Sequence, residues 1–413
     1  MSSSARPDVD ALVVGAGPAG VAAAIALRRA GREVVVIDKA TFPRDKCCGD
    51  GLTTLALREL EHLGFEPATV PSFTTVDTVV LRSPSGRSVD VPLPRGQGLY
   101  AAVTPRVELD AALVDLATAS GVKVHQGHGV AAVTGASENG TSVTVDVDGI
   151  GPITAGHVVA ADGMWSPTRK HLGLHEDGYL GEWHAIRQYV SGVTGPARDR
   201  LMVWFDADFL PGYAWSFPLP DGRANVGFGI LRRAGRPTKE MKAVWAAFFD
   251  RPHVAEALGP DATPENRHLA WPIPARVDKA RLAHGRVLFV GDAAGATDVM
   301  TGEGIGQALL TGRLAAEAIV AGRDVAAQYT REVRRELVAD HRMSVLLGRA
   351  LSHRKGACSA IWVVEHSGAW GRRNFARWMF EDEPRAIVAT PRRWHRKFLD
   401  RPGAYTAATP KSI

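Results

Sequence analysis

Three glycines near the start of the chain have the spacing of a loop that binds a dinucleotide pyrophosphate. The motif reads Gly15-Ala16-Gly17-Pro18-Ala19-Gly20. It lies between a buried strand expected over 9–14 and a helix expected to reach about Ala30. In this context the first glycine permits a tight turn, the second lets the backbone approach the pyrophosphate, and the third lets the helix pack on the strand. Free N–H groups at the start of the helix attract the phosphate oxygens.

An acidic residue stands where such a loop needs a partner for the ribose. Asp38 ends a second buried strand, expected over 33–38. Its carboxylate can accept hydrogen bonds from ribose hydroxyls and would repel a 2′-phosphate. The pair of features indicates FAD or NAD at this site rather than NADP.

Further segments decide between flavin and nicotinamide. Each is an ordinary strand-end turn when taken alone, but together and in this order they are distinctive: Thr41-Phe42-Pro43-Arg44, Asp162-Gly163, Val290-Gly291-Asp292-Ala293-Ala294 and Gly302-Glu303-Gly304-Ile305-Gly306. With the first glycine loop they resemble the FAD-dependent p-hydroxybenzoate-hydroxylase-like superfamily over most of residues 9–325. The sequence therefore favours FAD as the cofactor.

The resemblance implies roles for several of these residues. Asp292 would bind ribityl or ribose hydroxyls, and the helix that begins within 302–306 would direct its positive end at the flavin pyrimidine, stabilising negative charge on reduced flavin. Asp162 and Gly163 would lie near the nucleotide and the nicotinamide path, and Arg106 would lie near the pyrophosphate. The residues expected to bind FAD are Gly15, Gly17, Pro18, Ala19, Gly20, Asp38, Lys39, Arg44, Arg106, Val130, Asp162, Gly163, Asp292, Gly302, Gly304, Ile305 and Gly306.

The segment 42–52, FPRDKCCGDGL, narrows the resemblance. It is similar to the signature of the geranylgeranyl reductase family, whereas flavin-dependent halogenases share the Phe-Pro-Arg start but continue to Gly-Glu-Ser. Cys48 matches the family cysteine that lies over the flavin, where a thiol could donate a proton or position the substrate. The alternative is a small residue that packs at a turn. Cys47 departs from the proline often found there, and we interpret it as incidental.

A second segment carries the same resemblance. Residues 211–218, PGYAWSFP, and the later Gly227-Phe228-Gly229 are similar to the family motif Tyr-x-Trp-x-Phe-Pro…Gly-x-Gly. Because alternate residues of a strand point the same way, Tyr213, Trp215 and Phe217 form one aromatic stripe. The spacing alone would suit an ordinary core. With the family match, we expect the stripe to be the wall of a substrate cavity for a long apolar molecule.

The elements that must position these residues are discontinuous in the chain. We expect an α/β fold in which a Rossmann-type FAD-binding domain (1–73, 100–180 and 275–330) interleaves with a substrate domain (74–99 and 181–274). The substrate domain is expected to be a mostly antiparallel β-sheet, with a hairpin over 74–93. Residues 331–413 are expected to form a helical C-terminal cap.

Composition bounds the remaining possibilities. The 413 residues are 45% apolar and 23% charged, which allows a sizeable core and excludes general disorder. Three cysteines exclude a disulfide scaffold and a Cys-rich zinc module, so we expect a cytoplasmic protein. The uncharged run 11–27 is better explained as strand, turn and helix than as a signal peptide or membrane span. No histidine spacing suggests a metal site, and no motif suggests nucleic-acid binding.

The C-terminal segment is strongly basic. Residues 331–413 contain 17 Lys/Arg against 8 Asp/Glu, and four tryptophans: Trp362, Trp370, Trp378 and Trp394. Such helices could rest on a membrane surface as a peripheral contact. They could equally cover the substrate tunnel with their arginines toward solvent, which is the interpretation we favour.

These features lead to a function with named alternatives. The first is an FAD-dependent reductase that transfers hydride from reduced flavin to a C=C bond of an isoprenoid substrate. The second is an FAD monooxygenase that hydroxylates or epoxidises a terpenoid or aromatic metabolite, because the same fold serves both. The third is a flavin-containing binding or carrier protein without catalysis. Since there is no second glycine motif after a strand, NAD(P)H would dock transiently or a separate reductase would supply electrons.

Overall fold

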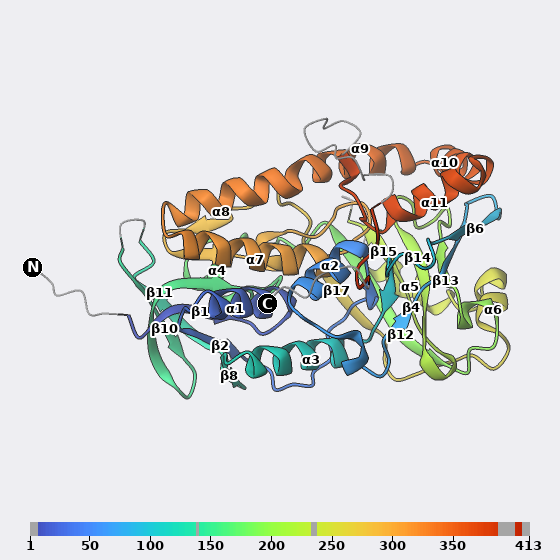
Figure 1. The fold of residues 1–413 in the computed structure, drawn as a ribbon. Helices are drawn as coiled ribbons and strands as arrows, with labels where there is room; N and C mark the ends of the chain where they lie inside the picture. Colours follow the sequence, from blue (N-terminus) through green and yellow to red (C-terminus); the bar gives the residue numbers. More distant parts are fainter. Residues whose placement is uncertain (1–6, 138–139, 233–237, 387–400, 407–413) are drawn as a thin grey trace, which may run out of the picture.

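Two β-sheets form the body of the molecule, and a row of C-terminal helices runs alongside them (Figure 1). The computed structural model describes residues 7–137, 140–232, 238–386 and 401–406. The α/β fold class with its two kinds of sheet and its helical C-terminal segment is confirmed. The domain boundaries drawn from the sequence stay a prediction.

The first sheet is mainly parallel and joins segments that are far apart in the sequence. Its strands run in the order β18-β19-β11-β1-β2-β8, with β10 and β9 added beside β11 as an antiparallel extension. The strands are β1 (Val9–Val14), β2 (Val34–Asp38), β8 (Lys123–Gln126), β9 (Val130–Thr134), β10 (Val143–Val147), β11 (Gly151–Ala160), β18 (Ala283–His284) and β19 (Val287–Phe289). The central strand β1 is almost wholly apolar and buried, as parallel strands covered on both faces are.

Long helices pack against this sheet. The helix α1 follows the glycine loop and packs against α7 and α3 (Figure 1). The helices of this region are α1 (Pro18–Arg29), α2 (Thr54–His62), α3 (Arg106–Ala119), α4 (Pro167–His171) and α7 (Ile305–Ala321). Gly312 allows the close α1–α7 contact, because a Cβ there would lie 2.1 Å from the backbone oxygen of Ala19.

The second sheet is antiparallel except for the β13–β5 pair. Its order is β16-β12-β15-β14-β13-β5-β6, with β17 also beside β12. The strands are β5 (Thr78–Arg82), β6 (Ser88–Pro92), β12 (Trp183–Ser191), β13 (Leu201–Trp204), β14 (Tyr213–Leu219), β15 (Arg223–Leu231), β16 (Thr263–Pro264) and β17 (Leu269–Ile273). The hairpin expected over 74–93 is present as β5 and β6. A small third sheet joins β3 (Gly51–Leu52), β7 (Ala102–Val103) and β4 (Thr74–Thr75).

Each face of the second sheet has its own apolar core. One face packs against α5 (Thr238–Ala246) and α6 (Pro252–Leu258), two helices that the sequence analysis did not anticipate. The other face packs against residues of α10 and α11. Because side chains alternate along β14, its aromatic stripe points to the second face, while Ala214 packs on the first.

The C-terminal helices form one continuous row. The helix α8 (Val325–Val333) continues through a π-helical segment, Arg334–Val338, into α9 (Ala339–Leu351). It is followed by α10 (Arg354–His366) and α11 (Gly368–Met379). In Figure 1 these orange-to-red helices run from α7 to the second sheet, where α11 and α10 contact β6. Trp394, noted in the sequence, lies outside the described residues.

Candidate active site

A cavity of about 540 Å³ lies where the glycine loop, the second sheet and the start of α7 meet. Its lining comes from both sheets and from the loops between them. The contributing residues lie within 14–19, 37–51, 128–130, 161–167, 183–187, 213–217, 269–273 and 290–308, together with Arg106 and Gly229. The residues singled out in the sequence therefore converge on one space.

The glycine loop has the backbone geometry that its spacing predicts. Gly15 has φ +104°, and a Cβ there would lie 2.4 Å from the Ala161 oxygen. Gly20 is equally constrained, since its Cβ would lie 1.8 Å from the Gly15 oxygen. Gly17 differs, because its Cβ would meet only the Arg44 guanidinium, at 3.7 Å. Gly17 lines the cavity and its open side leaves room for a phosphate.

The Asp38 carboxylate ties the end of β2 to this loop. It accepts hydrogen bonds from the backbone N–H groups of Ala16 and Ala40, both at 2.8 Å. The side chain is largely buried but lines the cavity beside Lys39. An ionised carboxylate can accept further hydrogen bonds, so it remains able to bind ribose hydroxyls.

Two helix N-termini open into the same cavity. The helix α1 begins after Gly17 and α7 begins after Gly304, and neither end has a side-chain cap. Pro18, Ala19 and Ile305, in the first turns, line the cavity. Uncapped N–H groups and the helix dipole favour negative charge at both places.

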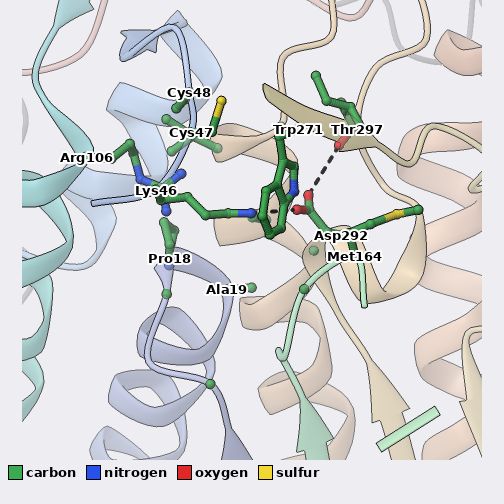
Figure 2. A pocket seen from close by; sticks show the side chains of 18 of the residues that line it. Pro18, Ala19, Lys46, Cys47, Cys48, Arg106, Met164, Trp271, Asp292 and Thr297 are labelled. Carbon is green, nitrogen blue, oxygen red and sulfur yellow. Dashed lines mark hydrogen bonds and ion pairs between the residues drawn. The ribbon is translucent and has the colours of Figure 1, made fainter. Parts of the chain in front are cut away.

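Asp292 lies at the end of the cavity nearer α7, and it has partners that the sequence did not reveal. Lys46 Nζ is 3.5 Å from its carboxylate and stands 4.4 Å from the centre of the Trp271 ring. Figure 2 shows the Lys46 side chain extended toward Trp271 and Asp292, with Thr297 on the other side of the carboxylate. Asp292 thus has a cation and a hydroxyl beside it inside the cavity.

Arg106 is held by a buried carboxylate. Its guanidinium makes two hydrogen bonds of 2.7 Å to Asp110 in a bidentate arrangement, and Arg44 lies 3.0 Å from the same carboxylate. Arg106 also lies close to Cys48. Burial raises the pKa of the Cys48 thiol to about 11, so the group stays a neutral thiol at pH 7.

A buried network behind Cys48 was missed by the sequence reasoning. Asp50 accepts hydrogen bonds from the Tyr189 hydroxyl and the Asn225 amide, both at 2.7 Å, and from the Arg106 N–H at 3.2 Å. Burial raises the pKa of Asp50 to about 6, although these donors oppose the shift. The network ties the 47–51 segment to the second sheet. Its members are far apart in the sequence, so no spacing could have indicated it.

The aromatic stripe reaches the same segment from the second sheet. Tyr213, Trp215 and Phe217 line the cavity with neighbouring ring centres 5.9 and 6.0 Å apart. A Cβ on Gly51 would lie 2.9 Å from the Phe217 ring, and one on Gly49 would lie 3.3 Å from it. The glycines of the Cys-Gly-Asp-Gly run therefore let the stripe approach the backbone closely.

Glu303, inside the Gly302–Gly304 motif, is a second residue that the sequence reasoning passed over. Its side chain lines the cavity, with Oε1 3.7 Å from the position a Cβ of Gly51 would take. Burial, together with the nearby carboxylates of Glu381 and Asp298, raises the pKa of Glu303 to about 8.

The C-terminal segment supplies a buried cation near this carboxyl group. Arg385 Nη1 is 2.6 Å from Asp298 Oδ2 and 3.3 Å from Glu381 Oε1. Glu381 also accepts hydrogen bonds from Thr53 and Gln307. The residues that follow α11 are thus joined to the start of α7 by ion pairs and hydrogen bonds.

Most of the predicted site residues line the cavity. Two glycines do not: Gly20 packs on its own loop, and Gly306 lies against the backbone of Ala56, where a Cβ would be 3.0 Å away. Both glycines let neighbouring backbone segments pack closely. The predicted residues that do line the cavity are Gly15, Gly17, Pro18, Ala19, Asp38, Lys39, Arg44, Cys48, Arg106, Val130, Asp162, Gly163, Tyr213, Trp215, Phe217, Asp292, Gly302, Gly304 and Ile305. Their roles in binding and catalysis stay a prediction.

The cavity suits a dinucleotide with an apolar neighbour. An open glycine and an uncapped helix end lie at one side, a carboxylate lies at the end of β2, and a second uncapped helix end lies beside the aromatic stripe. Within the described parts of the chain, no group of three or more His, Cys, Asp or Glu side chains could hold a metal ion.

Comparisons with known proteins agree with this geometry. Residues 8–335 match the model of the FAD binding domain family. The chain is 36% identical over 330 residues to a menaquinone reductase of Mycolicibacterium smegmatis, covering 76% of each chain. It is 33% identical over 316 residues to digeranylgeranylglycerophospholipid reductase 2 of Methanopyrus kandleri, covering 75% of this chain and 76% of the relative.

A solved structure shows the same fold over nearly the whole chain. The geranylgeranyl bacteriochlorophyll reductase-like protein of Thermoplasma acidophilum superposes with a TM-score of 0.76 at 20% identity, covering 93% of this chain and 98% of its own. The resemblance drawn from the 42–52 segment and the aromatic strand is therefore confirmed. The chain belongs to the geranylgeranyl reductase family of FAD-dependent oxidoreductases.

Proposed function

We propose that this enzyme reduces C=C bonds in the isoprenoid portion of a lipid or prenylated quinone. The observation that carries the proposal is the contact between the aromatic stripe and the 48–51 segment inside the FAD-type cavity. An apolar wall built from three aromatic rings suits a long hydrocarbon chain. The named relatives act on menaquinone and on a digeranylgeranyl lipid, which supports the same substrate class.

The residues proposed to hold FAD follow from the two ends of the cavity. The pyrophosphate would lie at Gly17 and the start of α1, and the adenosine ribose would meet Asp38. The flavin end would meet Asp292 and the start of α7, close to Cys48. When bound and reduced, FAD supplies a hydride. The protein's own part is to exclude water, to place the alkene beside the flavin and to provide a proton.

A single anaerobic experiment tests this function. Protein reduced with dithionite is mixed with a panel of prenylated quinones and prenyl lipids, and the products are weighed by mass spectrometry. We expect a product heavier by two hydrogens. A product heavier by one oxygen, formed only when air is admitted, would instead establish the monooxygenase alternative. Purified protein that is colourless and cannot be reconstituted with FAD would contradict the cofactor itself.

The electron donor is proposed to be NAD(P)H or a separate reductase. The sequence contains one dinucleotide loop, and the cavity reached by that loop is the one assigned to FAD. Stopped-flow mixing of the oxidised enzyme with NADH or NADPH without oxygen tests the first option. Bleaching of the flavin within the time of turnover would support a nicotinamide donor. Slow or absent bleaching would indicate a protein donor.

The outer surface of α10 and α11 is proposed to touch a membrane. Trp362, Val363 and Trp370 are each more than half exposed, and Arg354 and Lys355 are exposed on the same pair of helices. Tryptophan beside basic residues suits an anionic bilayer interface. Among the described residues, no helix combines the length and apolar composition needed to cross a bilayer.

Vesicle flotation tests this contact. The protein should float with vesicles that contain anionic phospholipid and should not float with neutral ones. The double variant Trp362→Ala/Trp370→Ala should lose flotation while it keeps its flavin. Equal flotation of the variant and the original protein would contradict a contact through α10 and α11.

A further inference from the structure

Reduction of an alkene requires a proton as well as a hydride, and the cavity contains several groups that carry one. The need for this proton follows from the proposed function. Cys48 is a poor acid, because burial raises the pKa of its thiol to about 11. The Tyr213 hydroxyl already donates its hydrogen to the Thr301 carbonyl oxygen. Asp50 is fully buried, and both of its oxygens already accept hydrogen bonds from donors behind the segment.

Glu303 is placed differently from these groups. It lies in the Gly302–Gly304 turn directly before α7, and its partly buried side chain lines the cavity. The backbone of Glu303 is fixed by two hydrogen bonds. Its carbonyl oxygen accepts one from the Asp298 N–H, and its own N–H donates one to the Thr301 hydroxyl. Within the described part of the chain, the carboxyl group itself has no hydrogen-bond partner. It is therefore available to a bound molecule.

The surroundings keep a proton on this carboxyl group at neutral pH. Burial is the largest cause, and the carboxylates of Glu381 and Asp298 act in the same direction. Arg385 opposes them, but its guanidinium is paired with those same two carboxylates. The resulting pKa of Glu303 is about 8, which lies close to the range where a general acid works best at pH 7.

The aromatic stripe brings the substrate to this group. Tyr213 and Cys48 both lie close enough to Glu303 to interact electrostatically with it. Phe217 and Glu303 approach Gly51 from the same side, since a Cβ on that glycine would contact both. A hydrocarbon chain lying along the stripe would therefore pass the carboxyl group.

We propose that Glu303 is the catalytic acid that protonates the alkene. With bound FAD supplying a hydride to one alkene carbon, the O–H bond of Glu303 would break and its proton would form a C–H bond at the other carbon. The alkene would gain two electrons, and the bound flavin would lose the same two. The resulting carboxylate regains its proton from water. Cys48, whose thiol keeps its proton, then acts by positioning the substrate.

Three variants test this assignment. Glu303→Gln keeps the size of the side chain and removes its acid, and Glu303→Asp keeps an acid on a shorter stem. Glu317→Gln changes an exposed carboxylate on α7, the helix that follows Glu303. Each is reduced with dithionite and mixed anaerobically with the prenyl substrate across pH 6 to 9. Rates are expressed per bound flavin, and reoxidation by oxygen is measured separately.

The expected loss for Glu303→Gln is about 100-fold or more in the alkene-reduction rate, the usual scale for removing a general acid. Reoxidation by oxygen should stay unchanged. The original enzyme should lose activity as the pH rises through about 8, and Glu303→Gln should lose this dependence. Glu303→Asp should recover part of the rate and keep the pH dependence. Glu317→Gln should behave as the original enzyme.

An infrared titration tests the proton without any substrate. Difference spectra of the flavin-loaded protein should show a protonated carboxyl band at pH 7 that disappears above pH 8 and is missing in Glu303→Gln. Absence of that band would overturn the proposal, and so would a full reduction rate in Glu303→Gln. If no prenyl lipid is reduced by the original enzyme, the proposed function fails, and the infrared band still decides whether Glu303 holds a proton.

Discussion

The two ends of the cavity are built in different ways. The pyrophosphate end comes from residues 15–20 and Asp38, which a single β1–α1–β2 unit brings together. The reactive end is assembled from the 45–51 segment, strands β12, β14, β15 and β17 of the second sheet, the turn before α7 and residues 381–385 beyond α11. The pyrophosphate end is therefore formed by one short stretch of the chain, whereas the reactive end depends on the whole fold.

The difference extends to the chemistry of each end. At the pyrophosphate end the binding groups are backbone N–H donors, and glycines leave the space they need. At the reactive end carboxyl groups are buried beside one another, and the pKa values of Asp50 and Glu303 both rise. Binding is therefore expected to depend on shape at the first end and on protonation at the second.

The largest expected effect on flavin binding is at the local end. Gly17→Val should weaken FAD binding by roughly 100-fold, equivalent to about 2.7 kcal/mol, because the side chain would fill the phosphate space. The fold should survive, since that side of Gly17 is open. Flavin absorbance per protein and circular dichroism measure the two effects.

Gly20→Ala is the matched control, because Gly20 serves the packing of the same loop and does not line the cavity. Its Cβ would collide with the Gly15 oxygen, so it should lower the free energy of unfolding by about 1–3 kcal/mol or more. Normal flavin loading in Gly17→Val would break the assignment of the pyrophosphate end.

The next effect concerns the assembled end. Arg385→Met should weaken the attachment of the segment after α11 by about 3 kcal/mol or more, because it leaves Asp298 and Glu381 buried without their cation. Hydrogen exchange in α11 and residues 380–386 should accelerate, while exchange in α1 stays slow. If α11 and residues 380–386 exchange at the same rate in the variant and in the original protein, the segment does not need this ion pair.

The reactive end should also make the free energy of unfolding depend on pH through Glu303. The pKa of Glu303 is raised from 4.5 to about 8, so between those pH values the unfolded chain ionises this group while the folded protein keeps it protonated. The folded state therefore loses stability progressively as the pH rises through this window. Relative to the original protein, Glu303→Gln should gain about 1–2 kcal/mol of unfolding free energy as the pH rises through this window, a figure reduced for the exposure of the group to the cavity. Urea unfolding at pH 4.5, 6 and 8.5 measures it, with Glu317→Gln as the control. A difference that stays constant with pH would contradict the raised pKa.

The smallest effect is expected at Cys48. Cys48→Ala should keep its flavin and slow alkene reduction by less than about tenfold, because the neutral thiol positions the substrate and does not supply the proton. Steady-state rates and flavin content measure this. An unchanged rate would remove Cys48 from the mechanism, and a loss as large as that of Glu303→Gln would make it the acid instead.

Particular elements show where sequence reasoning succeeded. The glycine loop, β1, α1 and β2 follow from hydrophobic runs and glycine spacing within one short segment, and the strands lie where those runs predicted. The alternation along β14 correctly placed three aromatic rings on one face. The helices α5 and α6 were not anticipated, because the region was interpreted mainly through its strands.

The amino-acid sequence by itself determined the cofactor class, the family and the local shape of the phosphate loop, because those properties depend on residue types at short, fixed spacing. The tertiary structure alone decided which charges meet at the reactive end. Glu303, Asp50, Arg385 and Tyr189 come from four distant segments, and no periodicity links them. Their burial and mutual distances set the protonation states, and these exist only once the sheets, α7 and the C-terminal segment are packed together.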